Sequence, residues 1–250
     1  MSQRNPYQGP RQPRFLPELC GPINLVTPPA SNALAIDKRN QASSLAMAKL
    51  HLRVSADQTG DDDVITQYLQ TATRYCEDRI DGGRTFLLTT FDMPIVHWWF
   101  DQSGLNIWGG DTGAGLEGGR QMEADGMREQ LPFPRPPLSS VTSVTYYDSN
   151  GNLQTLASSY YLVRKPWRQQ GTIERASLQV FPAVAPDYEW PITIRFVAGY
   201  GDGLTTFPPV EVQQAILVAT GWMYADREPT NRELDVVDQL LRTVSYGGYA

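Results

Sequence analysis

Residues 59–80, TGDDDVITQYLQTATRYCEDRI, carry the pattern that most constrains the fold. Apolar side chains recur there at the spacing of one buried helix face. They are Val64, Ile65, Tyr68, Leu69, Ala72, Tyr75, Cys76 and Ile80. The following DGG ends the helix, because Gly82 or Gly83 can adopt the left-handed conformation. The pattern therefore predicts a helix over 62–80 with one apolar stripe.

Further helices are predicted near 45–53, 209–227 and 232–244, each with apolar residues along one face. The last two lie far from 62–80 in the sequence. The region between, about 84–200, is rich in β-branched and aromatic residues and in turn signals. If the terminal helices pack together, this region is a β-rich insertion in a small α-helical core. The predicted fold class is therefore α+β.

Two details of the β-rich region can be predicted. The turn DSNGN contains Asn150-Gly151, which suits a hairpin with positive φ at both central positions. In WPITIRFVAGYGDG, Ile192, Ile194 and Phe196 alternate with Thr193 and Arg195. This strand is therefore predicted to have one dry face and one wet face.

Three segments lack a periodic pattern. Residues 1–44 have proline every few positions, which favours extended backbone and predicts an N-terminal arm rather than a domain. Residues 101–128 are dense in glycine and predict a mobile loop or hairpin tip. Residues 245–250 form a C-terminal tail. Residues 45–250 are expected to form one domain, which includes the helical core, the β-rich insertion, this loop and the tail.

Asp61, Asp62 and Asp63 raise the question of a metal or acid–base site. They stand at the first turn of the predicted helix, where free N–H groups and the helix dipole favour carboxylates. Thr59 or Asp61 could serve as the N-cap. A calcium loop needs oxygen ligands at alternating positions and a closing Glu, which this stretch does not supply. We therefore interpret the aspartates as the charged start of a helix.

The other candidate sites are also interpreted as structural. His51 and His97 have no second His or Cys at ligand spacing, and Cys20 and Cys76 are expected to be reduced thiols. GGDTGAGLEGG, at 109–119, lacks the Gly-Lys-Ser/Thr ending of a phosphate-binding loop. The stretch GYGDG is expected to form a tight turn. We expect no metal, no cofactor and no enzymatic activity.

Composition narrows the function classes. The chain has 250 residues, 41% of them hydrophobic, and a net charge of −6. An acidic chain does not offer the clustered Lys and Arg that grip phosphates, although DNA could pass beside it. The basic first residues are followed by no apolar stretch, so we expect neither a secretion signal nor a membrane span.

Several motifs in order resemble the tailed-phage head–tail connector family, also called adaptor or head-completion proteins. The matching stretch covers roughly 24–228. Its motifs are NLVTPPAS, SLAMAKLHLRV, DDDVITQYLQTATRYCEDRI, RTFLLTTFD, LPFPRPPLSSVTSVTYYDSNGN, YYLV, PITIRFVAGYGD and FPPVEVQQAILVATGWMYADRE. The sequence departs from the pattern in NALAIDKRNQA, in the glycine-rich insertion and in its longer proline-rich arm.

The resemblance implies a virion protein of the phage neck that is assembled in the host bacterial cytoplasm. Twelve subunits would form a ring beneath the portal, extend the DNA exit channel and dock the stopper or tail proteins. Double-stranded DNA would pass through the lumen without sequence-specific binding. The C-terminal tail would bind the portal through Tyr246, Gly247, Gly248, Tyr249 and Ala250.

Two alternatives remain open. The first is another ring of the neck or tail, such as a stopper or tail-completion protein, although those proteins are dominated by β-barrels. The second is a carbohydrate-binding or hydrolytic β module that uses Trp98, Trp99 and Trp167.

Overall fold

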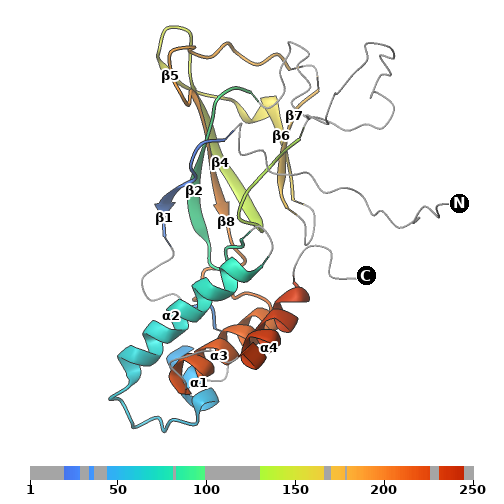
Figure 1. Cartoon of the computed structure of the whole chain (residues 1–250). Helices are drawn as coiled ribbons and strands as arrows, with labels where there is room; N and C mark the ends of the chain where they lie inside the picture. The colour runs from blue at the N-terminus through green and yellow to red at the C-terminus, as the bar shows by residue number, and fades with distance from the viewer. Residues whose placement is uncertain are drawn as a thin grey trace, which may run out of the picture.

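The computed structural model describes residues 20–28, 34–36, 44–80, 83–98, 130–165, 170–177, 179–225 and 231–244. The helices gather at one end of the molecule and the strands at the other (Figure 1). The predicted α+β class is therefore confirmed, and so is the order of a helical part interrupted by a β-rich region.

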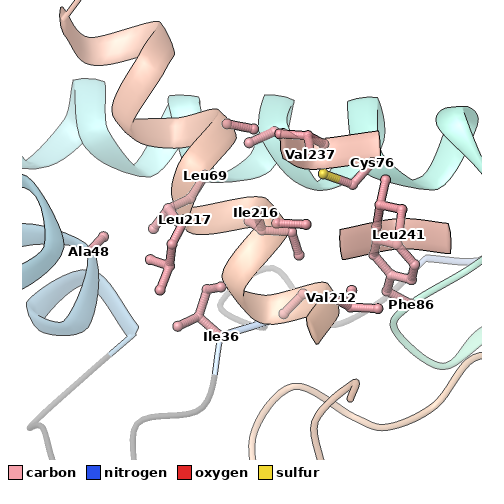
Figure 2. Packing of buried hydrophobic residues seen from close by; sticks show 14 of the residues in the cluster. Ile36, Ala48, Leu69, Cys76, Phe86, Val212, Ile216, Leu217, Val237 and Leu241 are labelled. Atoms are coloured by element: carbon pink, nitrogen blue, oxygen red, sulfur yellow. The ribbon is translucent and has the colours of Figure 1, made fainter. Parts of the chain in front are cut away.

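Four helices form the helical part. They are α1 Ser44–Leu52, α2 Asp62–Arg79, α3 Val210–Ala225 and α4 Asn231–Arg242. All four predicted helices are confirmed, and each end lies within two residues of its predicted position. α3 contacts the other three helices and lies at the centre of the group. Figure 2 shows the buried cluster that they share, including Leu69 and Cys76 of α2, Val212 and Ile216 of α3, and Leu241 of α4.

The aspartates at the start of α2 connect helices. Asp61 is confirmed as the N-cap residue, although its side chain makes no capping hydrogen bond. Its Oδ2 instead accepts a 2.9 Å hydrogen bond from the Tyr224 hydroxyl on α3. Asp62 forms a 2.8 Å ion pair with Lys49 of α1. Two of the three carboxylates therefore bind side chains of other helices, whereas Asp63 is exposed at the helix start.

Five strands form the larger sheet, which is antiparallel with the order β1-β2-β8-β4-β5. The strands are β1 Asn24–Thr27, β2 Thr89–Ile95, β4 Leu138–Tyr147, β5 Leu153–Thr155 and β8 Ile192–Ala198. The predicted alternation in β8 is confirmed, because Ile192, Ile194 and Phe196 are fully buried. On its other face Arg195 pairs with Asp92 of β2 through two 2.8 Å contacts.

A second, three-stranded sheet packs on the dry face. Its order is β3-β7-β6, and its strands are β3 Gln130–Pro132, β6 Tyr161–Arg164 and β7 Thr172–Arg175. Leu131, Phe133 and Ile173 share a buried cluster with the larger sheet, and the rings of Phe133 and Phe196 lie 5.0 Å apart. The β-rich region therefore has its own hydrophobic core, separate from the helical one.

The predicted hairpin joins β4 to β5, but its turn differs from the prediction. Gly151 has a φ of 79°, whereas Asn150 has no positive φ. The Asp148 side chain explains the difference, because Oδ1 accepts 2.9 Å hydrogen bonds from the N–H groups of both Asn150 and Asn152. This side chain closes a five-residue turn, so only one position needs the left-handed conformation.

Part of the predicted N-terminal arm is built into the domain. β1 pairs with β2, and Cys20 makes an isolated antiparallel bridge with Ile95. Ala35 and Ile36 are each only 1% exposed in the helical cluster. The Ser44 hydroxyl donates a 2.7 Å hydrogen bond to the Ile36 carbonyl. The described residues 20–28 and 34–36 thus contribute to both hydrophobic cores of their own chain.

A carboxyl group sits at the junction between the two parts. Glu77, near the end of α2, accepts a 2.6 Å hydrogen bond from the N–H of Phe86, where the chain enters the sheet. Burial raises the pKa of Glu77 from 4.5 to about 7, although the Phe86 N–H and the Arg135 charge oppose this shift. The protonated form is therefore favoured in the folded protein relative to the unfolded chain.

We predict a pH dependence from this group. Because the folded-state pKa of Glu77 is raised, its contribution to stability is fully present below pH 4.5 and is lost as the pH rises through 7. Glu77→Gln keeps the acceptor oxygen and cannot ionise. Its free energy of unfolding relative to wild type should therefore rise by about 3 kcal/mol between pH 4 and pH 8. Urea denaturation at both pH values measures this difference.

The control for that experiment is Gln70→Ala, an uncharged and exposed position of the same helix. Its free energy of unfolding should differ from that of wild type by the same amount at both pH values. A Glu77→Gln variant that also follows the wild-type profile would contradict the assignment.

Candidate interaction surfaces

The side chains that suggested chemistry lie apart from one another. His51 is at the end of α1 and faces Gly221 of α3, and partial burial lowers its pKa. His97 follows β2 at the other end of the molecule. The free thiols of Cys20 and Cys76 are buried in different cores, and burial raises their pKa values to about 11 and about 12. Both thiols therefore stay protonated at neutral pH.

Within the described ranges, no three His, Cys, Asp or Glu residues are placed to hold a metal ion. No helix in the same ranges is long and apolar enough to cross a membrane.

Trp98 belongs to the β core rather than to an open sugar-binding platform. Its ring makes an edge contact with Phe181, with 4.8 Å between the centroids, and its Nε1 donates a 2.8 Å hydrogen bond to the Pro182 carbonyl. These contacts give the half-buried ring of Trp98 a packing role within its own chain and so do not favour the carbohydrate alternative. Trp99 and Trp167 lie outside the described residues.

The GYGDG stretch is confirmed as a tight turn between β8 and α3. Asp202 accepts hydrogen bonds from the N–H groups of Leu204, Thr205 and Thr206, and these bonds lower its pKa, that of Thr206 having the largest effect. Gly199 has a φ of 129°, and a Cβ there would lie 2.5 Å from the Leu87 carbonyl. The turn therefore needs glycine to bring α3 back to the start of the sheet.

The most conspicuous exposed group lies at the end of the larger sheet farthest from the helices. The rings of Tyr147 and Tyr188 stack with centroids 4.2 Å apart and an interplanar angle of 13°. Leu153 pairs with Tyr147 across the hairpin and therefore lies on the same face. Tyr188 is 42% exposed and Leu153 is 61% exposed.

Carboxylates neighbour these apolar side chains in the sequence. Asp148 follows Tyr147, and Asp187 and Glu189 flank Tyr188. Hydrogen bonds from the turn, that of the Asn152 N–H above all, lower the pKa of Asp148 and keep it charged. Neither 147–153 nor 180–190 contains Lys, Arg or His. We call this surface the distal corner: Tyr147, Leu153 and Tyr188 with the carboxylates of Asp148, Asp187 and Glu189.

Backbone hydrogen bonds fix the geometry of the distal corner. The N–H of Tyr147 donates to the Pro191 carbonyl, and the N–H of Ala185 donates to the Tyr147 carbonyl, each at 2.9 Å. The segment that carries Tyr188 is therefore held against the end of β4. Rigid exposed tyrosines of this kind are typical of the centres of protein interfaces.

The opposite edge of the sheet is also exposed. All four residues of β1 are exposed, with Leu25 at 59% and Val26 at 40%. A bulge at Val26 interrupts the register with β2. The larger sheet thus presents apolar side chains at both of its edges, and these two surfaces differ from each other.

The sequence-based site prediction cannot be compared with this geometry. Tyr246, Gly247, Gly248, Tyr249 and Ala250 lie outside the described residues, as does the loop 101–128. The distal corner was missed because Tyr147 and Tyr188 are far apart in the sequence. The one available signal was DYEW, an aromatic pair interleaved with acids in a stretch without strand periodicity.

Solved structures of phage-like particles share this fold. A chain in the neck of an empty gene transfer agent (GTA) particle, computed with C6 symmetry, matches with a TM-score of 0.60 and 17% identity, over 88% of this chain and 95% of that chain. A chain in the virion of the native GTA particle matches with a TM-score of 0.58 and 18% identity, over 87% of this chain and 94% of that chain.

A chain in the neck of the native GTA particle, computed with C12 symmetry, has a TM-score of 0.58 and 16% identity, over 88% of this chain and 94% of that chain. No family model and no curated protein matches the sequence. At these identities the likeness concerns the fold. It confirms the resemblance to a head–tail connector at that level.

We predict that Gly199→Ala lowers the free energy of unfolding by about 2–4 kcal/mol, because the new Cβ meets the Leu87 backbone and φ is strained. Gly60→Ala is the control, since a Cβ there has no atom within 4 Å and should change stability by less than about 0.5 kcal/mol. Denaturant unfolding of both variants measures the difference. Equal effects would contradict the role of the turn.

Proposed function

We propose that this protein is a structural subunit of the neck of a tailed-phage-like particle and works as a head–tail adaptor. Twelve copies form a ring beneath the portal, which extends the DNA exit channel and docks the stopper or tail. The observation that carries this proposal is the fold shared with the GTA neck chains across nearly the whole length of both proteins. The work is mechanical, and we propose no catalytic step.

The symmetry of those necks supports a ring. They are computed with C6 and C12 symmetry, and a twelve-membered ring is compatible with both. A closed ring needs two different surfaces on each subunit, one of which contacts the other on the next copy. The exposed edges of the larger sheet provide two such surfaces.

Charge supports a lumen through which DNA slides. The net charge is −6, and the exposed face of the larger sheet carries a neutral Arg195–Asp92 pair rather than a cluster of cations. Tight phosphate binding depends on several Lys or Arg contacts. An acidic subunit therefore lets double-stranded DNA pass without holding it.

Another ring of the neck, such as a stopper or tail-completion protein, is the second candidate. The two described sheets are open, and four helices with their own core accompany them. This architecture favours the adaptor over a ring built from β-barrels.

Negative-stain imaging of the purified protein, with and without its portal, tests the proposal. We expect a ring that adds one layer to the portal. A protein that stays monomeric and does not bind the portal would contradict the adaptor role. A ring that binds the tail component and not the portal would support the second candidate.

The C-terminal tail can be tested separately. Deletion of residues 245–250 should abolish or strongly weaken binding to the portal, because Tyr246 and Tyr249 would supply the anchors and the glycines between them let the backbone bend. The thermal unfolding midpoint of the protein should stay unchanged, because the deleted residues lie outside the four described helices. Unchanged portal binding after the deletion would rule out this role for the tail.

A further inference from the structure

We propose that the distal corner binds the proline- and arginine-rich leading segment, residues 1–19, of a neighbouring copy of this chain. This inference deepens the proposed ring by naming one contact between its subunits, and the core of the bound stretch is Pro10-Arg11-Gln12-Pro13-Arg14.

The chemistry of the two partners is complementary. The leading segment holds Arg4, Arg11 and Arg14 against one acid, Glu18. The distal corner holds three carboxylates in two stretches without Lys, Arg or His. Arginine binds carboxylates through paired hydrogen bonds and also stacks on tyrosine rings. Arg11 and Arg14 can therefore use both the acids and the aromatic rings of the corner.

The proline spacing suits an aromatic surface. The prolines of the leading segment are Pro6, Pro10, Pro13 and Pro17, and PRQPR has prolines three residues apart followed by a cation. Pro-x-x-Pro segments favour the polyproline II helix, which has three residues per turn and loses little entropy on binding. Such helices bind exposed aromatic surfaces. The stacked Tyr147 and Tyr188, with Leu153 beside them, form a surface of this kind.

The leading segment enters the described structure at the same end of the sheet. Cys20 pairs with Ile95, the last residue of β2, and the N–H of Gly21 donates a 2.9 Å hydrogen bond to the Pro94 carbonyl. A Cβ on residue 21 would lie 2.9 Å from the ring of Trp190, so this ring packs directly on the glycine. Trp190 is two residues from Tyr188. The segment and the corner thus share the distal end of the molecule.

The proposed ring supplies a neighbouring copy as the source of the segment. Cys20 lies along the β1–β2 edge, whereas Tyr147 and Leu153 lie on β4 and β5 at the opposite edge. We infer that these two edges face each other in the proposed ring, because a closed ring joins two different surfaces of each subunit. Five residues of fully extended chain span at most about 17 Å, a reach that would let Arg14 cross a subunit boundary from Cys20. The contact therefore joins the β1–β2 edge of one copy to the β4–β5 edge of the next.

A peptide titration tests the binding surface. A labelled peptide of residues 5–18 is titrated with full-length protein that carries Arg11→Glu and Arg14→Glu, so that its own leading segment does not compete. We expect saturable binding that weakens at least about tenfold when Tyr188→Ala is added. A peptide with Pro10→Ala and Pro13→Ala should bind as weakly. Leu162→Ala, at an exposed apolar position on the smaller sheet, is the control and should leave binding unchanged.

A charge exchange distinguishes a specific contact from nonspecific binding. Asp187→Lys with Glu189→Lys should reject the natural peptide and accept one that carries Arg11→Glu and Arg14→Glu. Binding that Tyr188→Ala leaves intact, or that the charge exchange does not redirect, would overturn the proposal.

The wild-type chain identifies the source of the segment. If the segment comes from a neighbour, dilute wild-type monomer binds the peptide as tightly as the arginine variant does, and the assembled ring does not bind it. A wild-type monomer that rejects the peptide would show that the segment binds within its own chain, which overturns the proposal. If the ring binds the portal but the monomer does not bind the peptide, this inference is refuted and the proposed adaptor is not. Peptide binding by a chain that forms no ring refutes the proposed adaptor and not the contact.

Discussion

The packing of α2 against α3 is the contact on which the rest of the structure depends. Ile65, Leu69, Ala72 and Cys76 of α2 are at most 1% exposed, and they share their cluster with Val212, Ala215 and Ile216 of α3. The whole β-rich region lies between these helices in the sequence. The helical core therefore closes only when the β-rich region brings its two ends together, which the glycine turn before α3 makes possible.

The two cores have different consequences for the surface. The helices bury their apolar stripes on one another, and Phe86 and Leu87 carry that cluster to the base of the sheet. Within the described residues, the smaller sheet packs on one face of the larger sheet, and apolar side chains at its distal end and at both edges are exposed. Rigid exposed tyrosines at one edge and an extended edge strand at the other suit a subunit that assembles with copies of itself. Function of this kind depends on how surfaces are distributed, and a single reactive group is not required.

Local patterns were sufficient for most of the elements. Helix periodicity predicted all four helices, and alternation predicted which face of β8 is buried, because both signals depend only on neighbouring residues. The details that these patterns did not predict each involve a partner remote in sequence or a competing side chain. Asp61 bonds to Tyr224 rather than to its own helix end, and the Asp148 side chain selects the hairpin turn. The packing of Trp98 also depends on remote partners, since its ring contacts Phe181 and its Nε1 donates to the Pro182 carbonyl.

The sequence by itself determined the elements, their order and the class of fold, because amphipathic spacing and turn chemistry are local properties. It also determined that the aspartates of TGDDDVITQ begin a helix. Only the tertiary structure decided what those aspartates bind, which strands become edges and which aromatic rings stay exposed. Tyr147 and Tyr188 meet because β4 and β8 are neighbours in the larger sheet, although β5, β6 and β7 separate them in the sequence. No local pattern encodes that meeting, since burial and contact depend on how all the elements pack at once.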